Sequence, residues 1–174
     1  FEGAYALRRD LRAWGIEGEV ASIEAGEPFQ RRAPSDYSAD NMLAIRQLSI
    51  VLHGPQPETL VPPVDPATLA AALREYLDEL LARRLDDARV TDVAAWALNV
   101  ARCLYGLESG SLSTKPEADA WLAARAPETA PVMRVALATR GGRTATGVEA
   151  RLRSGVPLLR ALARRDLPDR IARS

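Results

Sequence analysis

The chain has 174 residues, of which 47% are hydrophobic and 26% charged, ordinary values for a globular protein that buries a core. Its 23 basic side chains balance 23 acidic ones, which argues against a broad nucleic-acid-binding surface. With one Cys and one His, the chain can form neither an internal disulfide nor a zinc site built from Cys and His ligands.

The N-terminal part of the chain predicts a strand followed by irregular structure. Residues 1–7 are rich in aromatic and small apolar side chains, which is typical of a strand, and Glu2 is the one carboxylate among them. Residues 8–14 fit a short helix or a turn. Residues 15–34 mix Gly, Glu, Pro and Arg without a clear period, which predicts a loop.

Two helices are predicted in the next part of the chain. Ser38 is a good N-cap for a helix that runs through Leu48 into a short apolar run, which fits a buried strand or the end of that helix. Asp65 as N-cap and Pro66 as the first helical residue then begin the clearest helix of the chain. Its leucines recur at helical spacing to about Arg84.

A third helix is expected to begin near residues 91–92 and to end at Gly106 and Gly110. Asn99 and Arg102 are three residues apart on one of its faces, so they can act together. The apolar stripe of this helix consists of Val93, Trp96, Ala97, Val100, Leu104 and Leu107.

Further helices are predicted in the rest of the chain. Thr114 and Glu117 have the spacing of a capping box, and Pro127 ends the helix that they open. Pro131 begins a fifth helix, and the last one is kinked or split at Pro157 and followed by a frayed tail. The chain is therefore predicted to be mainly α, a bundle of about five to six helices preceded by a remnant strand.

The sequence also bears on location and on two single residues. No apolar run approaches the about 20 residues that a membrane-spanning helix needs, and no signal peptide precedes the first strand, so we expect a cytoplasmic protein. The chain begins at Phe1 in what resembles the middle of a sheet, and we expect it to be a fragment. We expect His53 to be structural, because no nucleophile signature lies nearby, and Cys103 to be a small buried apolar residue.

The turn between the third and fourth helices brings together two cationic side chains. Arg102 lies on the apolar helix before the turn, and Lys115 opens the helix after it. This arrangement suits anionic groups such as nucleotide phosphates, because an anion at a helix N-terminus can meet an ammonium and backbone amides together. Similar turns occur in plain helical bundles, in which Arg102 would bridge helices through Glu108 or Asp119.

Three blocks of sequence resemble the aminoglycoside 3''-adenylyltransferases, the streptomycin and spectinomycin resistance enzymes. Residues 98–127 are similar to the C-terminal helical domain of that family. Residues 51–55 are similar to the segment between its two lobes, and residues 1–5 to the last central strand of its nucleotidyltransferase domain. The residues that match at the family's spacing in the first block are Arg102, Tyr105, Gly110, Lys115, Ala118 and Trp121.

The resemblance implies a division of the chain into two parts. Residues 1–35 would be a C-terminal remnant of an α/β nucleotidyltransferase domain. Residues 36–174 would form the C-terminal helical domain, which binds substrate and nucleotide. The implied reaction is the transfer of AMP from ATP, with Mg²⁺, to a hydroxyl of an aminoglycoside-like acceptor, which confers antibiotic resistance.

The resemblance also implies which carboxylates act. In that family two Asp residues, on a Gly-Ser loop and the neighbouring strand, bind the metal, and a third carboxylate is the general base. This chain matches only the third, so Glu2 is implied as general base and metal ligand. Because the Asp pair has no match, we expect the 174 residues alone to be inactive and to depend on a missing N-terminal nucleotidyltransferase lobe.

Five other side chains have roles implied by the resemblance. Lys115 and Arg102 would contact the ATP phosphates. Asp36 would lie near the nucleotide, or else be a solvated loop acid. Asp92 would pair with a cationic acceptor, or else complement the helix dipole. Asn99 would contact the acceptor, or else be satisfied within the bundle.

Two departures from the family bear on the ligands. Leu80 stands where the family carries an aromatic residue, which argues against stacking on streptomycin. Arg140 stands where the family carries a Tyr near the nucleotide, which changes how ATP would be held. The acceptor would then be another hydroxylated, cationic small molecule.

Two other functions remain open from the sequence. One is a non-catalytic helical module, for ligand binding or for interactions of the toxin–antitoxin kind, of nucleotidyltransferase ancestry. The other is a purely structural bundle. As partners we expect ATP and a small-molecule acceptor, with no nucleic acid and no membrane.

Overall fold

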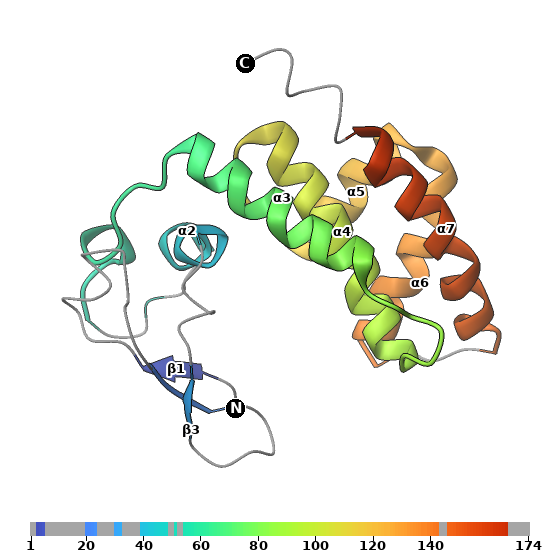
Figure 1. The fold of residues 1–174 in the computed structure, drawn as a ribbon, viewed down its shortest axis with the longest axis horizontal. Coiled ribbons are helices and arrows are strands. Elements are labelled where there is room, and N and C mark those ends of the chain that lie inside the picture. The colour runs from blue at the N-terminus through green and yellow to red at the C-terminus, as the bar shows by residue number, and fades with distance from the viewer. Residues whose placement is uncertain are drawn as a thin grey trace. The chain divides into compact units, whose positions relative to one another are not determined.

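The structure is a computed structural model (Figure 1). It describes residues 3–5, 20–23, 30–32, 39–48, 51, 54–142 and 146–166. The chain divides into two compact units, residues 1–72 and 73–174. The predicted boundary between residues 35 and 36 falls outside the described residues and stays a prediction.

The first unit contains a small antiparallel sheet. Its strands are β1 (Gly3–Tyr5), β2 (Val20–Ile23) and β3 (Gln30–Arg32), in the order β1-β2-β3. The strand predicted over residues 1–7 is confirmed in its centre, but the loop predicted over residues 15–34 is wrong, because β2 and β3 lie within it. Strands of three or four residues are too short to show an alternating period, and pairing with neighbouring strands defines them.

The two helices predicted in the first unit begin where the sequence places them. The helix expected after Ser38 is α2 (Ala39–Leu48), and a short 3-10 helix, η2 (Pro57–Thr59), packs beside it. The long helix α3 (Pro66–Ala82) begins in this unit and ends in the second. Asp65 caps it as predicted, since its Oδ1 atom accepts hydrogen bonds of 3.0 Å from the N–H groups of both Ala67 and Thr68.

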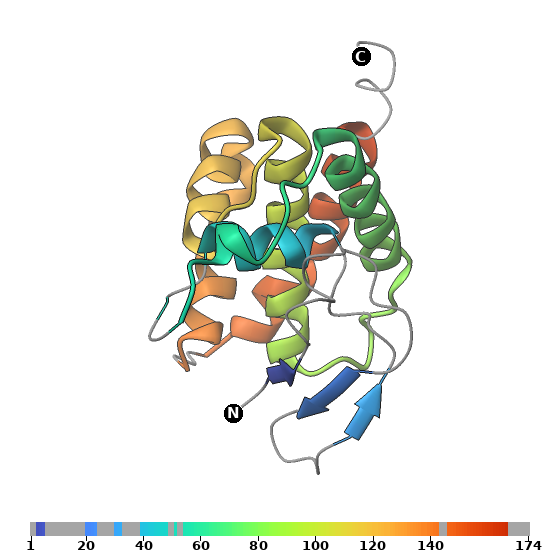
Figure 2. The same cartoon turned by 90° about the vertical axis from the view of Figure 1, so that its left-hand side faces the viewer.

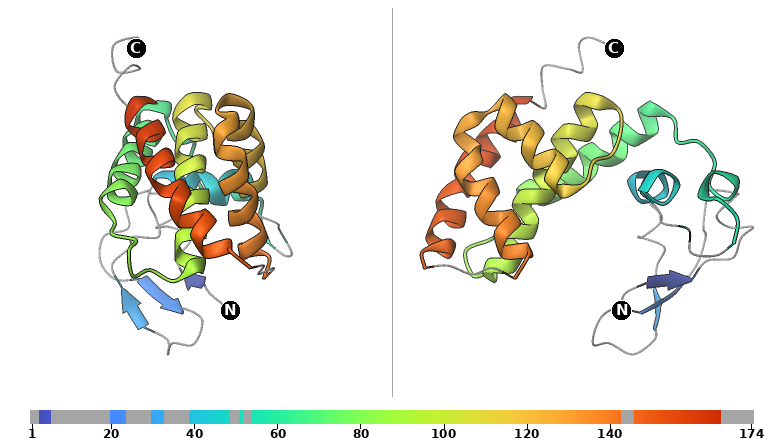
Figure 3. Two further views of the ribbon diagram at one scale, coloured as in Figure 1. Left: turned by 90° about the vertical axis from the view of Figure 1, so that its right-hand side faces the viewer. Right: turned by 180° about the vertical axis from the view of Figure 1, so that it is seen from behind.

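The second unit is a helical bundle built around α4 (Val90–Ser109). This helix packs against α5 (Lys115–Arg125), α6 (Ala130–Arg140) and α7 (Val148–Asp166), as Figures 2 and 3 show. A 3-10 helix, η3 (Pro127–Thr129), connects α5 to α6. None of the described helices is long and apolar enough to cross a membrane. The core of the unit is formed by Leu77, Leu80, Trp96, Leu98, Leu122, Met133, Leu152 and Leu159.

Local signals set most of the helix ends in the second unit. Gly110 ends α4 in a left-handed conformation with a φ of 68°, as predicted, whereas Gly106 lies inside the helix. The capping box of Thr114 and Glu117 is present at the start of α5. The predicted split at Pro157 does not occur, because α7 is continuous and one proline removes only one N–H from its hydrogen bonds.

The substitution Gly155→Ala tests the packing of α7 on α6. A Cβ at this position would lie 2.7 Å from the Cβ of Val132, a stiff β-branched residue. We expect a loss of about 1–3 kcal/mol in the free energy of unfolding, measured by urea denaturation, because neither backbone can easily move. Gly106→Ala is the matched control. Its Cβ would meet the flexible end of Leu73 at 2.6 Å and the backbone oxygen of Ser111 at 3.2 Å, and because the closest atom belongs to a flexible side chain we expect a smaller loss. Equal stability of the Gly155→Ala variant and the parent protein would show that the close packing is wrong.

Candidate functional site

One face of α4 carries the candidate ligand residues. Asp92, Ala95, Asn99 and Arg102 are spaced at i, i+3, i+7 and i+10, so they follow one another along one side of the helix. All four are partly exposed, whereas Val93, Trp96, Val100 and Cys103 on other sides are buried. We call the row formed by the first four residues the α4 strip. An acid lies at one end of it and a guanidinium at the other.

Three cations gather at the C-terminal end of the α4 strip. We call Arg102, Lys115 and Arg140 the cationic corner. They come from α4, from the first turn of α5 and from the last turn of α6. Burial lowers the pKa of the half-buried Lys115 ammonium, and the positive charges of Arg140 and Arg102 lower it further. Arg140 was not predicted to join this group, although its departure from the family pattern was a signal.

No acid within the described part of the chain forms an ion pair with Lys115, Arg102 or Arg140. Glu108, one of the partners considered for Arg102, instead pairs with Arg125 at 2.9 Å. Like charges brought together without a counter-ion destabilise one another, and a bound anion would remove that repulsion. The arrangement is therefore suited to an anionic ligand.

Arg102 does bridge two elements, but not through a carboxylate. Its Nε atom donates a 3.0 Å hydrogen bond to the carbonyl oxygen of Ser113, in the turn before α5. The alternative prediction, that Arg102 bridges helices through Glu108 or Asp119, is therefore wrong for the contacts of the described residues. Among the described residues only Nε of Arg102 has a hydrogen-bond partner, so the two terminal nitrogens of the guanidinium can donate to an anion.

The first turn of α5 adds few backbone amides to this corner. The carboxylate of Glu117 accepts the Thr114 N–H at 2.7 Å, and the Thr114 hydroxyl accepts the Glu117 N–H at 3.4 Å. Pro116 has no N–H to offer. The expectation that several amides of this helix converge on an anion is therefore not met, and an anion here would depend on side-chain cations.

Asp92 holds the N-terminal end of the α4 strip and is already paired. Its two carboxylate oxygens accept hydrogen bonds from the Nε and Nη2 atoms of Arg89, at 3.0 and 3.2 Å. This bidentate contact with Arg89 is the main reason that the pKa of Asp92 lies below its usual value. Asp92 also lies in the first turn of α4, so its charge complements the helix dipole as well.

Asn99 lies in the middle of the α4 strip and has a partner that the sequence did not predict. Its Nδ2 atom donates a 3.0 Å hydrogen bond to the hydroxyl of Tyr76 on α3. Tyr76 lies at the same helical spacing as the leucines of α3, and this spacing alone does not indicate a polar partner. Leu80, one turn further along, is only 1% exposed, so it cannot stack on a ligand.

The remaining candidates are not placed by the structure. Glu2, Asp36 and His53 lie outside the described residues. Within the described ranges, no group of three His, Cys, Asp or Glu side chains is arranged to hold a metal ion. Cys103 is buried, as expected.

The helices that carry this site match a known protein family. A family model described as aminoglycoside adenylyltransferase, C-terminal domain, matches residues 59–164. The match covers α3 to α7 almost completely, and with them the α4 strip and the cationic corner. No curated protein matches the chain.

Proposed function

The chain belongs to the aminoglycoside adenylyltransferase family through its C-terminal domain, and we propose that it is the helical lobe of an enzyme that transfers AMP from MgATP to a hydroxyl of an aminoglycoside-like acceptor. The observation that carries this proposal is the cationic corner. Three cations from three helices meet there without a described carboxylate to neutralise them. A polyphosphate is a ligand of the matching charge.

In the proposed reaction the cationic corner binds the triphosphate of ATP. The acceptor hydroxyl oxygen forms a bond to the α-phosphorus, and the bond from that phosphorus to the bridging oxygen breaks, so that pyrophosphate leaves. Lys115 and Arg102 hold the phosphates and offset the charge that develops on the leaving group. Arg140, which replaces the family's Tyr, adds a third positive charge to this role.

The other end of the α4 strip binds the acceptor. Asp92 accepts a cationic group of the acceptor, and Asn99, oriented by the Tyr76 hydroxyl, binds one of its polar groups. Asp92 and Arg102 are ten residues apart on the helix, which corresponds to about 15 Å at 1.5 Å per residue. The cationic acceptor and the anionic phosphates would therefore bind at separate positions on the same helix.

Two further roles in the proposal fall on residues outside the described ranges. Glu2 would deprotonate the attacking hydroxyl and serve as a metal ligand, and Asp36 would contact the nucleotide. Bound Mg²⁺ would neutralise phosphate charge and orient the phosphates. The described residues supply no metal-binding cluster of their own. Since the 174 residues contain no match for the family's Asp pair, we expect no AMP transfer by these residues alone.

The test separates binding from transfer. Calorimetric titrations of the protein with MgATP, and then with spectinomycin and streptomycin, measure the two ligands. Mass spectrometry of the acceptor measures the gain of one AMP when a nucleotidyltransferase domain carrying the Asp pair is present. We expect Asp92→Asn to weaken acceptor binding and to leave the Kd of MgATP unchanged, because only the acceptor end of the α4 strip is altered.

Each outcome decides between the candidate functions. An AMP adduct on the acceptor supports the enzyme. Binding of both ligands with no adduct, in the presence of the Asp pair, supports the non-catalytic ligand-binding module of the same ancestry. Failure of MgATP to bind even when that nucleotidyltransferase domain is present overturns the nucleotide role of the cationic corner and leaves the structural bundle.

A further inference from the structure

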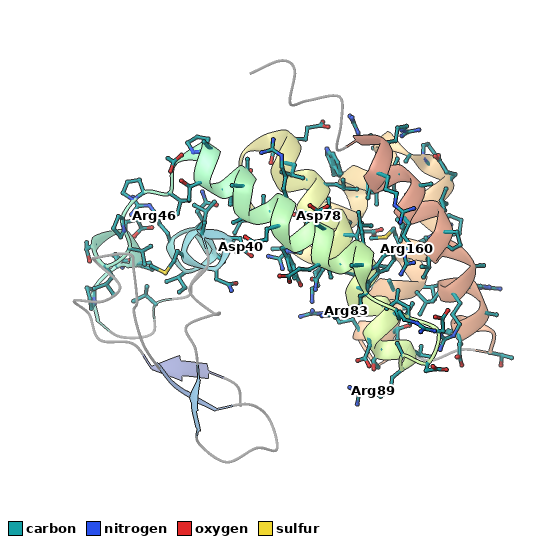
Figure 4. The ribbon with its side chains drawn as sticks, in the orientation of Figure 1. Asp40, Arg46, Asp78, Arg83, Arg89 and Arg160 are labelled. Atoms are coloured by element: carbon teal, nitrogen blue, oxygen red, sulfur yellow. The ribbon has the colours of Figure 1, made fainter. Side chains whose placement is uncertain are left out.

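The guanidinium of Arg89 occupies the position at which a cationic acceptor would meet Asp92. The two nitrogens of Arg89 and the two oxygens of Asp92 face each other as a pair of parallel hydrogen bonds. The Arg89 side chain is 83% exposed and that of Asp92 is 44% exposed. Figure 4 shows the Arg89 side chain extending outward at the start of α4.

The backbone of the loop that carries Arg89 is held by hydrogen bonds from α7 that do not involve the Arg89 side chain. Arg153 on α7 donates hydrogen bonds to the carbonyl oxygens of Leu85 and Ala88, at 2.6 and 2.8 Å. Arg160, also on α7, donates to the carbonyl oxygen of Arg83 at 2.6 Å (Figure 4). The loop before α4 is therefore fixed at several carbonyl groups, so the guanidinium of Arg89 can leave Asp92 by side-chain rotation alone.

We propose that Arg89 is a resident counter-ion of Asp92, which a cationic group of the acceptor must displace, and that Arg89 thereby tunes which acceptors bind. The inference rests on the proposed function, since it takes Asp92 as the acceptor contact. Displacement exchanges one cation for another on the same carboxylate. A cation that offers two parallel N–H donors, or several charges, replaces the two hydrogen bonds and the ion pair that Asp92 loses when Arg89 leaves. A singly charged amine with one donor does not replace them.

The size of the effect follows from the exposure of the pair. Exposed ion pairs are weak and are screened by salt. Removing Arg89 therefore leaves Asp92 free at little cost to folding, and we expect the acceptor to bind about twofold to fivefold more tightly. Salt dependence should also change. In the parent protein one cation replaces another at Asp92, whereas in Arg89→Ala the acceptor meets a bare carboxylate, so its binding should weaken more steeply with added salt.

The experiment measures the Kd of spectinomycin and of streptomycin by calorimetry at low and high salt. Arg89→Ala is compared with Arg84→Ala, which removes another exposed Arg of the same loop, one that pairs with Asp86 at 3.6 Å. We expect tighter binding and a steeper salt dependence in Arg89→Ala and no change in Arg84→Ala. We expect no effect of Arg89→Ala when it is combined with Asp92→Asn.

Two results would overturn the inference, for different reasons. If Asp92→Asn weakens acceptor binding but Arg89→Ala leaves it unchanged or weakens it, Arg89 is no competitor, and the acceptor role of Asp92 stands. If Asp92→Asn alone leaves acceptor binding unchanged, Asp92 is not the acceptor contact, and both the inference and that part of the proposed function are wrong.

Discussion

Replacement of Lys115 by alanine is expected to weaken MgATP binding by about 10- to 100-fold, the loss that follows from removing a charge-assisted hydrogen bond of about 1.5–3 kcal/mol. Lys115 is the half-buried member of the cationic corner, and burial lowers its pKa. Binding of a phosphate would relieve the repulsion from Arg102 and Arg140. The ammonium therefore gains more from an anion than an isolated surface lysine would.

A matched control separates this role from a change in net charge. Arg151→Ala also removes one positive charge, from an exposed position on α7, and we expect it to leave the Kd of MgATP unchanged. The acceptor Kd should be unaffected by Lys115→Ala, since the acceptor end of the α4 strip is intact. Equal MgATP affinities for Lys115→Ala and Arg151→Ala would contradict the nucleotide role of the corner.

Helix starts were predictable from the sequence because the responsible contacts are local. Asp65 accepts from residues two and three positions further along the chain, and Thr114 and Glu117 cap α5 across three positions. Contacts over so few residues leave a signature in the order of residue types. The spacing of Asn99 and Arg102 along α4 could be predicted for the same reason.

The loop that carries Arg89 could not be predicted in this way. Its carbonyl groups bond to Arg153 and Arg160, which lie 65 to 77 residues further along the chain. Tyr76 and Asn99 are 23 residues apart, and nothing in the apolar repeat of α3 indicates that a tyrosine hydroxyl meets an amide. Likewise Arg140, at the end of α6, joins the cationic corner only when α5 and α6 pack together. Such partners are set by tertiary packing, which periodicity alone does not reveal.

Trp96 makes another long-range contact near the candidate site, because it holds the end of α3 against α4, the helix that carries the α4 strip. Its side chain is 1% exposed, and its Nε1 atom donates a 2.7 Å hydrogen bond to the carbonyl oxygen of Leu80. Carbonyl groups in the last turn of a helix have no partner within the helix, so this bond acts as a cap from a neighbouring helix. The guanidinium of Arg160 lies over the Trp96 ring, 5.8 Å from its centre.

Trp96→Ala is therefore expected to lower the free energy of unfolding by about 3–5 kcal/mol, as is usual when a fully buried Trp is removed. For a protein of this length, that loss corresponds to a fall in Tm of about 6–20 °C, measured by thermal unfolding followed by circular dichroism. Part of the loss comes from the cavity and part from the lost indole hydrogen bond, after which the Leu80 carbonyl oxygen keeps only the longer bond, 3.3 Å, from the Arg83 N–H.

Two further variants identify the cause. Trp96→Phe keeps an aromatic ring in the core but removes the N–H, so we expect an intermediate loss of stability. Trp121→Ala removes a half-exposed ring that packs edge-on against Tyr105 at 5.7 Å, and we expect a smaller loss because less apolar surface is buried there. If Trp96→Phe were as stable as the parent protein, the hydrogen bond to the Leu80 carbonyl oxygen would not contribute to holding α3 against α4. Burial of the ring alone would then hold the two helices together, and the loop before Asp92 would depend on that burial and on the arginines of α7.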